Sequence, residues 1–393
     1  MARNERVEAL KKLESERGGR LVISYITSTR TNFEIQIGDD VLPLFHEHLE
    51  AATTKAKKGV DLFIHSNGGS GTVPWRLVSL IREYTKDFAV LVPHRAFSAA
   101  TLIALGANDI VMHRMGCLGP IDPSVANQFN PPNPQNPGLP IPISVEDVTA
   151  YFKLVKEEIG INHEDELIQA LIALTDAKMH PLHPLALGNV QRSHQQSRLM
   201  ARKLLLTHME VKQEHEIDAI IDILKSNLFF HGHPINRKEA KEESLNLKVT
   251  AAPVDLERAM WKLYTEYEKE LRLREPFSPL HELDIALQAQ LAAQAQQAAA
   301  QAQQAASQGQ QAGAQGQPGT NPPAIAIGPA IALNPTQVKA NLKNLPGVYV
   351  ESIDHTDVFL TDLNLQRTSV NTPMGPQELI KQEIIWQRWE KEI

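Results

Sequence analysis

The stretch that decides the fold runs through residues 61–107 and contains two turns rich in glycine and serine. The first lies in Asp61-Leu-Phe-Ile-His-Ser-Asn-Gly-Gly-Ser-Gly71, and the second in Phe88-Ala-Val-Leu-Val-Pro-His-Arg-Ala-Phe-Ser-Ala-Ala-Thr-Leu-Ile-Ala-Leu-Gly-Ala107. Each turn follows a short apolar run and precedes a helix-like stretch. Glycine lets backbone N–H groups approach a developing oxyanion, and a hydroxyl beside them can attack a carbonyl. The pair therefore predicts a site for acyl transfer.

Both turns also have simpler interpretations. Gly68 and Gly69 are equally typical of a tight strand-to-helix turn, or of a phosphate site at a helix N-terminus. The segment lacks the Gly-Lys-Ser/Thr sequence of a P-loop. Ser98 opens the apolar run that begins at Ala99, and most serines in such a position cap a helix.

Composition narrows the class of protein. A chain of 393 residues can bury a full core and is long enough for more than one domain. Its formal net charge of -7 provides no basic footprint for nucleic acid. The single cysteine, Cys117, argues against an intrachain disulfide or a cysteine-based zinc site and favours a cytoplasmic compartment. The sequence contains no run of about 18 apolar residues, so no membrane span is expected. The charged N-terminus has no apolar core, so no secretory signal is expected there.

Apolar periodicity predicts alternating strands and helices over the first part of the chain. We expect strands at 21–27, 60–65, 88–92 and 109–112, and helices at 5–17, 40–55, 73–84 and 99–105. Alternating charges predict that the first helix is exposed. Short apolar strands that alternate with helices favour a parallel sheet with right-handed crossovers, and hence an α/β fold.

Composition also divides the chain into segments. Residues 1–143 are expected to form the core, including a proline-rich loop at 123–142, and residues 144–280 a helical extension. The helices of the extension are expected at 145–158, 164–176, 189–208, 214–226 and 255–272. Residues 281–336 are an Ala/Gln-rich helical arm followed by a Gly- and Pro-bearing linker. The small segment 337–393 is expected to contain strands and then an amphipathic helix from Pro376 to Ile393.

The two turns together resemble the core of the Clp protease and crotonase superfamily. Ile64-His-Ser-Asn-Gly-Gly-Ser70 is similar to the turn that supplies an oxyanion N–H in Clp-type and signal peptide peptidase A-type serine peptidases. Ala96-Phe-Ser-Ala-Ala-Thr101 is similar to their nucleophile turn, and Met115-Gly-Cys-Leu-Gly-Pro-Ile-Asp122 to the strand and Gly-rich turn that follow. The order and spacing agree with this resemblance.

Over residues 20–250 the chain resembles the serine dehydrogenase proteinase family in particular. Members of that family carry Leu-Gly-Pro-Ile-Asp-Pro, as in Leu118–Pro123, and a helical second half similar to Pro184–Arg192 and His231–Ala240. The resemblance implies a Clp/crotonase-like ββα superhelical core, a peptidase rather than a dehydrogenase, and a homo-oligomer. The dinucleotide fingerprint Gly-x-Gly-x-x-Gly is absent, and no cofactor is expected.

Carried over to this sequence, the resemblance makes Ser98 the nucleophile. The N–H groups of Gly68, with Gly69 beside it, and of Ala99 would form the oxyanion hole. An extended peptide substrate would add beside a strand, using the backbone near Gly69–Val73.

The general base is the part that the resemblance does not supply. Clp-type enzymes place a histidine after the Gly-rich strand, but Gly119-Pro-Ile-Asp-Pro123 contains none. Signal peptide peptidase A-type enzymes use a lysine, which must be neutral and so needs a desolvated site. The candidates are Lys153, Lys156, Lys178 or a neighbouring subunit, and each lysine is alternatively a solvated surface side chain. Asp122 is a candidate for orienting a base or binding a substrate N–H.

The sequence thus predicts a serine peptidase that hydrolyses peptide bonds through an acyl-enzyme on Ser98, with a lysine base. Two alternatives stay open: an oligomeric scaffold of the same fold without a working base, and an acyl-CoA-processing enzyme of the crotonase type. His180-Pro-Leu-His183 and His231-Gly-His233 suggest a metal site, but no clear carboxylate partners stand at ligand spacing, so no metal is expected.

Overall fold

The computed structural model describes residues 2–392 apart from 122–123, 126–127, 134–135, 142, 145–147, 149, 152, 161–162, 175–182, 227–232, 243–244, 314–338 and 373–374. The chain forms two compact units. The first comprises Met1–Glu275, Gly347–Val358 and Glu390–Ile393, and the second Pro276–Pro346 and Phe359–Trp389. Both predicted turns lie in the first unit.

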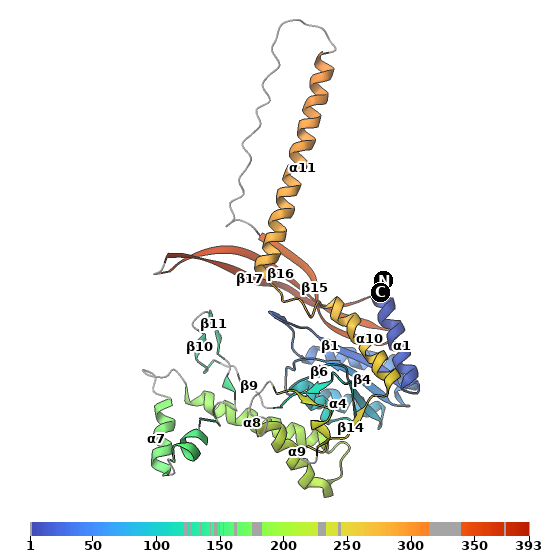
Figure 1. Cartoon of the computed structure of the whole chain (residues 1–393), viewed down its shortest axis with the longest axis vertical. Helices are drawn as coiled ribbons and strands as arrows, with labels where there is room; N and C mark the ends of the chain where they lie inside the picture. The colour runs from blue at the N-terminus through green and yellow to red at the C-terminus, as the bar shows by residue number, and fades with distance from the viewer. Residues whose placement is uncertain are drawn as a thin grey trace. The chain divides into compact units, whose positions relative to one another are not determined.

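A largely parallel sheet forms the centre of the first unit (Figure 1). Its parallel strands follow the order β14 (Val249–Ala251), β7 (Asp109–Met112), β5 (Phe88–Val92), β4 (Val60–His65) and β1 (Leu21–Thr27). Every residue of β1, β4 and β5 is buried, as expected for parallel strands covered on both faces. The predicted α/β class is confirmed, and β14 is a strand that was not predicted.

Helices pack around this sheet in two groups. In one, α1 (Ala2–Glu16) packs on α10 (Val254–Glu270) and contacts β1. In the other, successive helices contact one another: α2 (Leu42–Ala51), α4 (Val73–Tyr84), α5 (Ala99–Leu105) and α8 (Pro184–Leu205). The shorter or more peripheral helices are η1 (Asp39–Val41), α3 (Thr53–Ala56), η2 (Leu154–Glu158), α7 (Glu164–Leu174), η3 (Val211–Gln213), α9 (Glu214–Ser226) and η4 (Glu239–Lys241).

The prediction that the first helix is exposed is wrong for one of its faces. Arg6, Leu10 and Leu13 of α1 are fully buried, because this face packs on α10. Arg6 and Glu14 are therefore buried charges, whereas Lys11 and Lys12 on the exposed side pair with glutamates of the same helix.

Outside the central sheet, short strands form three pairs and one three-stranded sheet among the described residues. The predicted loop at 123–142 contains several of them, so it is more regular than expected. These strands are β2 (Thr29–Arg30), β3 (Phe33–Glu34), β6 (Arg95–Ala96), β8 (Cys117–Leu118), β9 (Ser124–Val125), β10 (Pro132–Asn133), β11 (Asn136–Pro140), β12 (Ile143–Ser144) and β13 (Ile235–Asn236).

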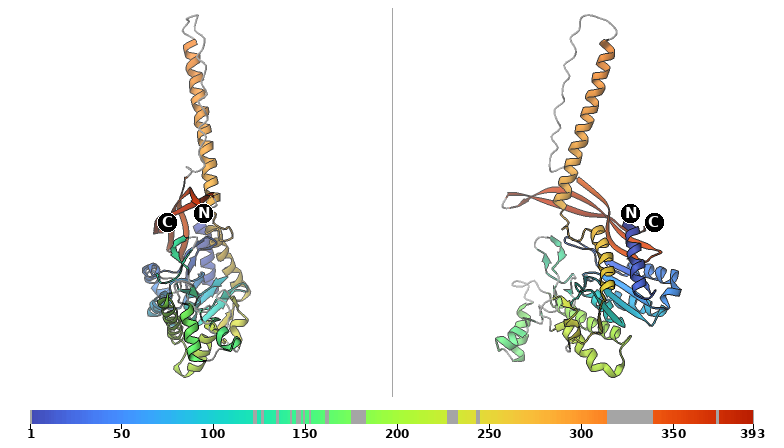
Figure 2. Two further views of the ribbon diagram at one scale, coloured as in Figure 1. Left: turned by 90° about the vertical axis from the view of Figure 1, so that its left-hand side faces the viewer. Right: turned by 45° about the vertical axis from the view of Figure 1, so that its right-hand side comes forward.

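The second unit combines a long helix with the outer parts of three strands (Figure 2). The predicted Ala/Gln-rich helical arm is confirmed as α11 (Pro279–Gly313), whereas most of the predicted linker lies outside the described residues. Arg367 pairs with Asp284 at 3.2 Å, which ties a strand of this unit to the first turns of α11.

The predicted C-terminal helix is wrong. Residues 376–393 fall almost entirely in β17 (Gly375–Lys391), which lies beside β16 (Thr356–Thr372), and β16 lies beside β15 (Lys339–Glu351). The isoleucines and tryptophans that suggested a helical face are also strong strand formers, and pairing with a long neighbouring strand decides between the two.

Residues 347–358 belong to the first unit and make two sets of buried polar contacts within it. β15 pairs antiparallel with β1, and Glu351 at its end accepts a hydrogen bond from the Arg6 guanidinium at 2.7 Å. His48 of α2 contacts Ser352 Oγ through Nδ1 at 2.8 Å and Asp357 Oδ2 through Nε2 at 3.1 Å. All these side chains are buried, so the contacts fix the C-terminal strands to the core.

Candidate active site

The two predicted turns meet at an open cleft of about 510 Å³. One wall comes from residues 34–37 at and after the end of β3, and another from the glycine turn at 67–71. Ser98 and Ala99 at the start of α5 line the cleft between them, and the middle of α8 forms a further side. The pairing of the glycine turn with Ser98 is therefore present in the folded chain.

Ser98 has a strained backbone at the start of α5. Its φ of 51° and ψ of -112° lie in a region that costs a non-glycine residue about 1–3 kcal/mol. Its side chain makes no capping hydrogen bond to α5, so the alternative role as a helix cap is not realised. Within the described part of the chain, Ser98 Oγ has no hydrogen-bond partner and lines the cleft.

Backbone hydrogen bonds join the two turns rigidly. Ser66 N–H donates to Arg95 O at 3.1 Å, and Phe97 N–H donates to Ser66 O at 3.0 Å. The Gly-rich turn after β8 is attached from the other side, because Gly119 N–H donates to Thr101 Oγ1 of α5 at 3.1 Å. Strand ends and α5 thus hold the Ser98 turn in place.

The backbone N–H groups of Gly68 and Gly69 differ in their hydrogen bonding. Gly68 N–H donates to Ser66 Oγ at 3.0 Å, so this N–H is already used within the turn. A Cβ on Gly68, at φ 109°, would lie 2.7 Å from Ser98 Cβ, which explains why only glycine fits so close to the serine. Among the described residues, the N–H groups of Gly69 and Ala99 have no acceptor.

Gly69 is held by the adjacent wall at residues 34–37, which pairs with the glycine turn. Ile37 N–H donates to Gly68 O at 2.9 Å, and Ser70 N–H donates to Ile37 O at 2.9 Å. A Cβ on Gly69, at φ 154°, would lie 2.4 Å from the Ile37 nitrogen. The wall at residues 34–37 therefore fixes the orientation of the Gly69 peptide.

The cleft is polar but almost uncharged. Glu34 is the sole ionisable side chain among its described lining residues, and neither a lysine nor a histidine is among them. Lys153 and Lys156 are exposed on the helix that includes η2 and do not line the cleft of the same chain. Lys178 and Asp122 lie outside the described residues. The folded chain thus brings Ser98 and the glycine turn together without either described lysine.

Two histidines near the turns belong to a separate aromatic cluster. His65 stacks on His94 with ring centroids 5.5 Å apart, and both rings contact Tyr264. Burial holds the pKa of His65 well below its usual value, and its Nε2 contacts Thr29 Oγ1 at 3.0 Å. Neither histidine lines the Ser98 cleft, so neither is placed to accept a proton from Ser98.

One wall of the cleft was not predicted. Ser193, Gln196 and Ser197 of α8 line it, and Ser197 Oγ donates to Ile121 O at 2.6 Å. A helix was expected over 189–208, but periodicity does not reveal which distant turn a helix contacts. No signal in the sequence marks these three residues.

The described residues contain no group of three or more His, Cys, Asp or Glu side chains placed to hold a metal ion. His233 instead contacts Glu239 at 2.7 Å, and His183 Nδ1 accepts the Leu185 N–H at 3.1 Å. In the same part of the chain, no helix has the length and hydropathy needed to cross a bilayer.

Comparison with known proteins identifies relatives for part of the chain. An uncharacterized protein of Methanocaldococcus jannaschii is 28% identical over 190 residues, which are 48% of this chain and 54% of that protein. A second uncharacterized protein of the same organism is 27% identical over 124 residues, which are 31% of this chain and 42% of that protein. The chain thus spans about half the length of the curated relatives it matches. Residues 3–134 match the family of ClpP-like SDH-type serine proteinases, which confirms the predicted family for the part of the chain that carries Ser98 and both turns.

Proposed function

We propose that the chain is a serine peptidase that cleaves peptide bonds through an acyl-enzyme on Ser98. The observation that carries this proposal is the strained Ser98 turn, which lines a cleft beside two N–H groups that have no acceptor among the described residues. Strain of this kind persists only where the surroundings impose it, and it is typical of functional sites. The match to a serine proteinase family over residues 3–134 supports the same reaction class.

The proposed oxyanion hole consists of the Gly69 and Ala99 N–H groups. Ser98 Oγ attacks the scissile carbonyl carbon and transfers its proton to a base, while these donors stabilise the charge on the carbonyl oxygen. The leaving amine then takes the proton, and water releases the acyl group and restores the serine hydroxyl. Gly68 contributes close approach rather than a donor, because its own N–H is bonded to Ser66.

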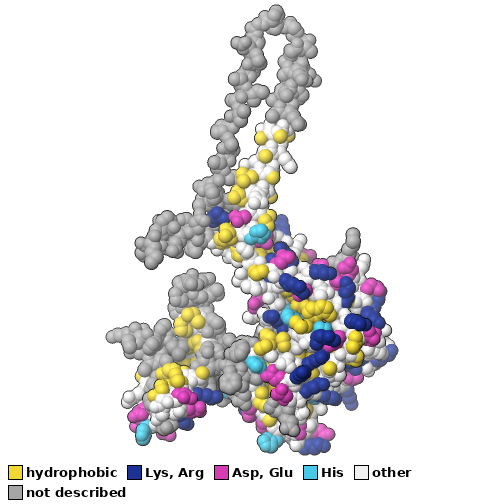
Figure 3. Space-filling view, viewed as in Figure 1, with side chains coloured by type: hydrophobic (Ala, Val, Ile, Leu, Met, Phe, Trp, Pro, Cys, Tyr) yellow, Lys and Arg dark blue, Asp and Glu magenta, His cyan; other side chains and the backbone are white. Residues whose placement is uncertain are grey.

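The proposed base is a lysine brought to the cleft by a neighbouring copy of the chain. Lys153 and Lys156 are exposed, and so are the apolar side chains of Leu154, of Ile159 just after η2 and of Ile168 in α7. Figure 3 shows hydrophobic side chains on the surface of the part of the chain that carries α7. Such clustered apolar side chains are typical of a protein contact surface. A contact made there would also remove water from a lysine and favour its neutral form.

A fluorophosphonate probe tests both parts of this proposal. The full chain should be labelled at Ser98, and Ser98→Ala should abolish labelling. Replacing the true base among Lys153, Lys156 and Lys178 by alanine should slow labelling about 10²- to 10⁴-fold. Lys212→Ala is the matched control, because this exposed lysine pairs with Glu210 and does not line the cleft. Labelling that persists in Ser98→Ala would refute the assignment of the nucleophile.

One observation favours a second function, that of a binding scaffold with the same fold. The described residues around Ser98 include no lysine or histidine. The scaffold function predicts that the assembled protein binds peptides. It also predicts that the protein neither reacts with the fluorophosphonate probe nor cleaves an unfolded protein substrate.

A further inference from the structure

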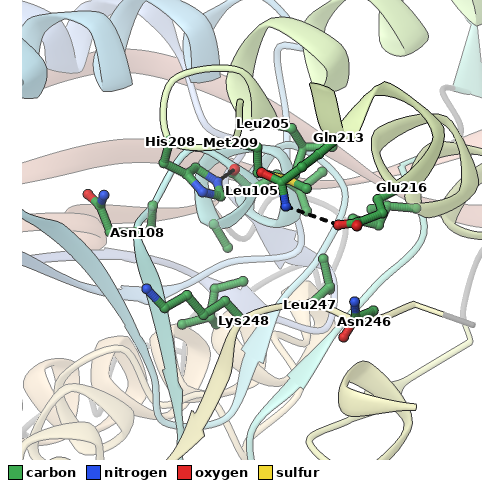
Figure 4. Close-up of a pocket in the computed structure, with 14 residues that line it drawn as sticks. Leu105, Asn108, Leu205, His208, Met209, Gln213, Glu216, Asn246, Leu247 and Lys248 are labelled. Atoms are coloured by element: carbon green, nitrogen blue, oxygen red, sulfur yellow. Dashed lines mark hydrogen bonds between the residues drawn. The ribbon is translucent and has the colours of Figure 1, made fainter. Parts of the chain in front are cut away.

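Two features of the molecule lie outside the Ser98 cleft and offer a surface to a partner. One is a pocket of about 240 Å³, formed where the C-terminal end of α5 meets α8 and α9 (Figure 4). Its charged side chains, Lys248 and Glu216, lie on opposite sides of it and define no single ligand. The other is the free edge of β17, where the sequence of the strand restricts what can pair with it.

The outer edge of β17 is a long site for strand pairing. Among the described strands, β17 is the last in the order of the eight-stranded sheet and pairs only with β16. It comprises 17 residues, Gly375–Lys391, whereas strands in globular proteins average about 5–6 residues. The N–H and C=O groups on its free side are therefore available to another strand.

The middle of this edge strand is apolar and exposed. Ile384, Ile385 and Trp386, here called the apolar triplet, are 57%, 51% and 64% exposed. Successive side chains of a strand point to opposite faces, so Ile385 lies on one face of the strand and the other two lie on the other face. Natural proteins protect free edges with charges, prolines or bulges, and the triplet contains neither a charge nor a proline. The centre of β17 is therefore suited to contact another strand rather than water.

Pairing of β17 with a second copy of itself is limited to a few registers. An antiparallel pair of identical strands can have a two-fold axis, which closes the assembly at two copies. Side chains that face each other lie on the same face of the sheet, and neighbours along a strand alternate between faces. The residue at the axis must therefore lie opposite its own copy, and three registers place that axis within the apolar triplet.

The register centred on Ile385 matches the apolar side chains of the two copies. It places Ile385 opposite its own copy on one face, and Ile384 opposite Trp386 twice on the other face. Cross-strand pairs between aromatic and β-branched side chains stabilise antiparallel strands. Over residues 380–390, no two like charges lie opposite each other in this register.

The two neighbouring registers lack this match. An axis one residue nearer the N-terminus places Ile385 opposite Glu383. An axis one residue nearer the C-terminus places Lys381 opposite Lys391, and like charges directly opposite each other are destabilising. The apolar triplet and the charges around it therefore favour the same register.

We propose that β17 is the interface of a two-fold dimer in which two copies of the chain pair antiparallel about Ile385. The partner is a second copy, because the pattern of apolar and charged residues on this edge is complementary to itself. Pairing joins the strands of the two copies into one continuous sheet and covers the apolar centre of both edges. This surface does not include the exposed lysines near η2, so this proposal and the proposed function can fail separately.

Single cysteines within the apolar triplet test both the dimer and its register. Cys117→Ser gives a parent chain without cysteine. In that parent, Ile385→Cys should form an intermolecular disulfide under mild oxidation, since facing Cβ atoms lie about 4.5–5.5 Å apart. Ile384→Cys and Trp386→Cys should cross-link at least about ten-fold more slowly, because neither faces its own copy and the diagonal separation exceeds about 7 Å. Lys212→Cys is the control for random collision, because this exposed side chain lies outside β17.

Sedimentation of a charged variant supplies a second measurement. Ile385→Lys places two ammonium groups opposite each other and should weaken association at this interface about ten-fold or more. Leu199→Lys is the matched control, because it puts the same charge on an exposed leucine of the first unit and should leave the association unchanged.

Three results would overturn the proposal. The first is cross-linking of Ile385→Cys that is no faster than that of Lys212→Cys, and the second is faster cross-linking at residue 384 or 386. The third is an Ile385→Lys protein that sediments like the parent. A β17 edge covered by another segment of the same chain, or by a different protein, would give the first result, because Ile385→Cys would then have no copy of itself opposite.

Discussion

Two serines of the first unit, Ser352 and Ser98, each have only part of what a hydrolytic site requires. Ser352 has the neighbours of a catalytic serine: His48 lies 2.8 Å from its Oγ, and Asp357 lies 3.1 Å from the other nitrogen of the same ring. Ser98 has no such neighbour among the described residues, yet it lines a cleft beside free N–H groups. Ser352 is only 3% exposed, so no substrate carbonyl reaches it.

The difference shows that a hydrogen-bonded Ser–His–Asp set is not sufficient for a site. Catalysis needs a serine that the substrate can reach, N–H donors for the developing negative charge, and a base. In this chain the histidine lies at the buried Ser352, whereas the cleft and the N–H donors lie at Ser98. The contacts of His48 are better explained as an anchor for the C-terminal strands. The Ser98 turn has access and N–H donors, and in the proposed peptidase the base comes from a neighbouring copy of the chain.

The largest expected effect separates the two serines directly. Ser98→Ala should reduce the hydrolysis of a peptide substrate on the order of 10³-fold or more, because it removes the nucleophile. Ser352→Ala should change the rate per folded molecule less than about two-fold, since Ser352 never contacts substrate. Rates measured on fluorogenic peptides, with folding checked by circular dichroism, decide the matter. A large loss in Ser352→Ala alone would reverse the assignment.

A second test concerns the donors that Ser98 has and Ser352 lacks. Gly69→Ala should lower the hydrolysis rate about 10²- to 10³-fold, because the added methyl group collides with Ile37 and turns the Gly69 N–H away. Gly71→Ala is the matched control: it lines the same cleft, but its Cβ would meet nothing within 4 Å. Equal rates in the two variants would argue against Gly69 as a donor.

The anchoring role of His48 predicts a loss of stability instead of activity. His48→Ala should lower the free energy of unfolding by about 2–3 kcal/mol, because it leaves Asp357 and Ser352 buried without their partner. Chemical denaturation measures this loss, and probe labelling of the folded fraction should not change. His46→Ala, on the exposed side of the same helix, should cost less than about 0.5 kcal/mol. An unfolding free energy unaffected by His48→Ala would rule out the anchor.

The smallest expected effect is the release of strain at Ser98. Ser98→Gly should be more stable than Ser98→Ala by about 1 kcal/mol, because glycine adopts a φ near 51° without the steric cost borne by alanine. Thermal unfolding of the two inactive variants measures the difference. If the alanine variant is the more stable one, the turn does not store strain.

Sequence reasoning worked best where structure is decided locally. The bounds of α4, β5, α5 and β7 agree with their predicted ranges, because each is a short apolar run between turn residues. The C-terminal strand β17 was mistaken for a helix, because its partner β16 lies outside the window in which periodicity is read. Local patterns do not contain that partner.

The residues of the candidate site likewise fall into those that local motifs reveal and those that they do not. The two turns and Ser98 could be recognised from motifs within fewer than 40 residues of one another. The wall from α8 could not, because Ser193 and Gln196 lie about 100 residues further along the chain. The use of the Gly68 N–H by Ser66 depends on a side-chain rotation that no sequence pattern encodes.

The pairing of β15 with β1 bears on how the protein can be shortened. The family match ends at residue 134, whereas the strand that covers the edge of β1 comes from residues 339–351. A fragment ending near residue 134 would leave the edge of β1 free to pair with other chains, and Arg6 would lose Glu351 as its counter-charge. Such a fragment should aggregate, so the region that matches the family and the unit that folds are not the same stretch of chain.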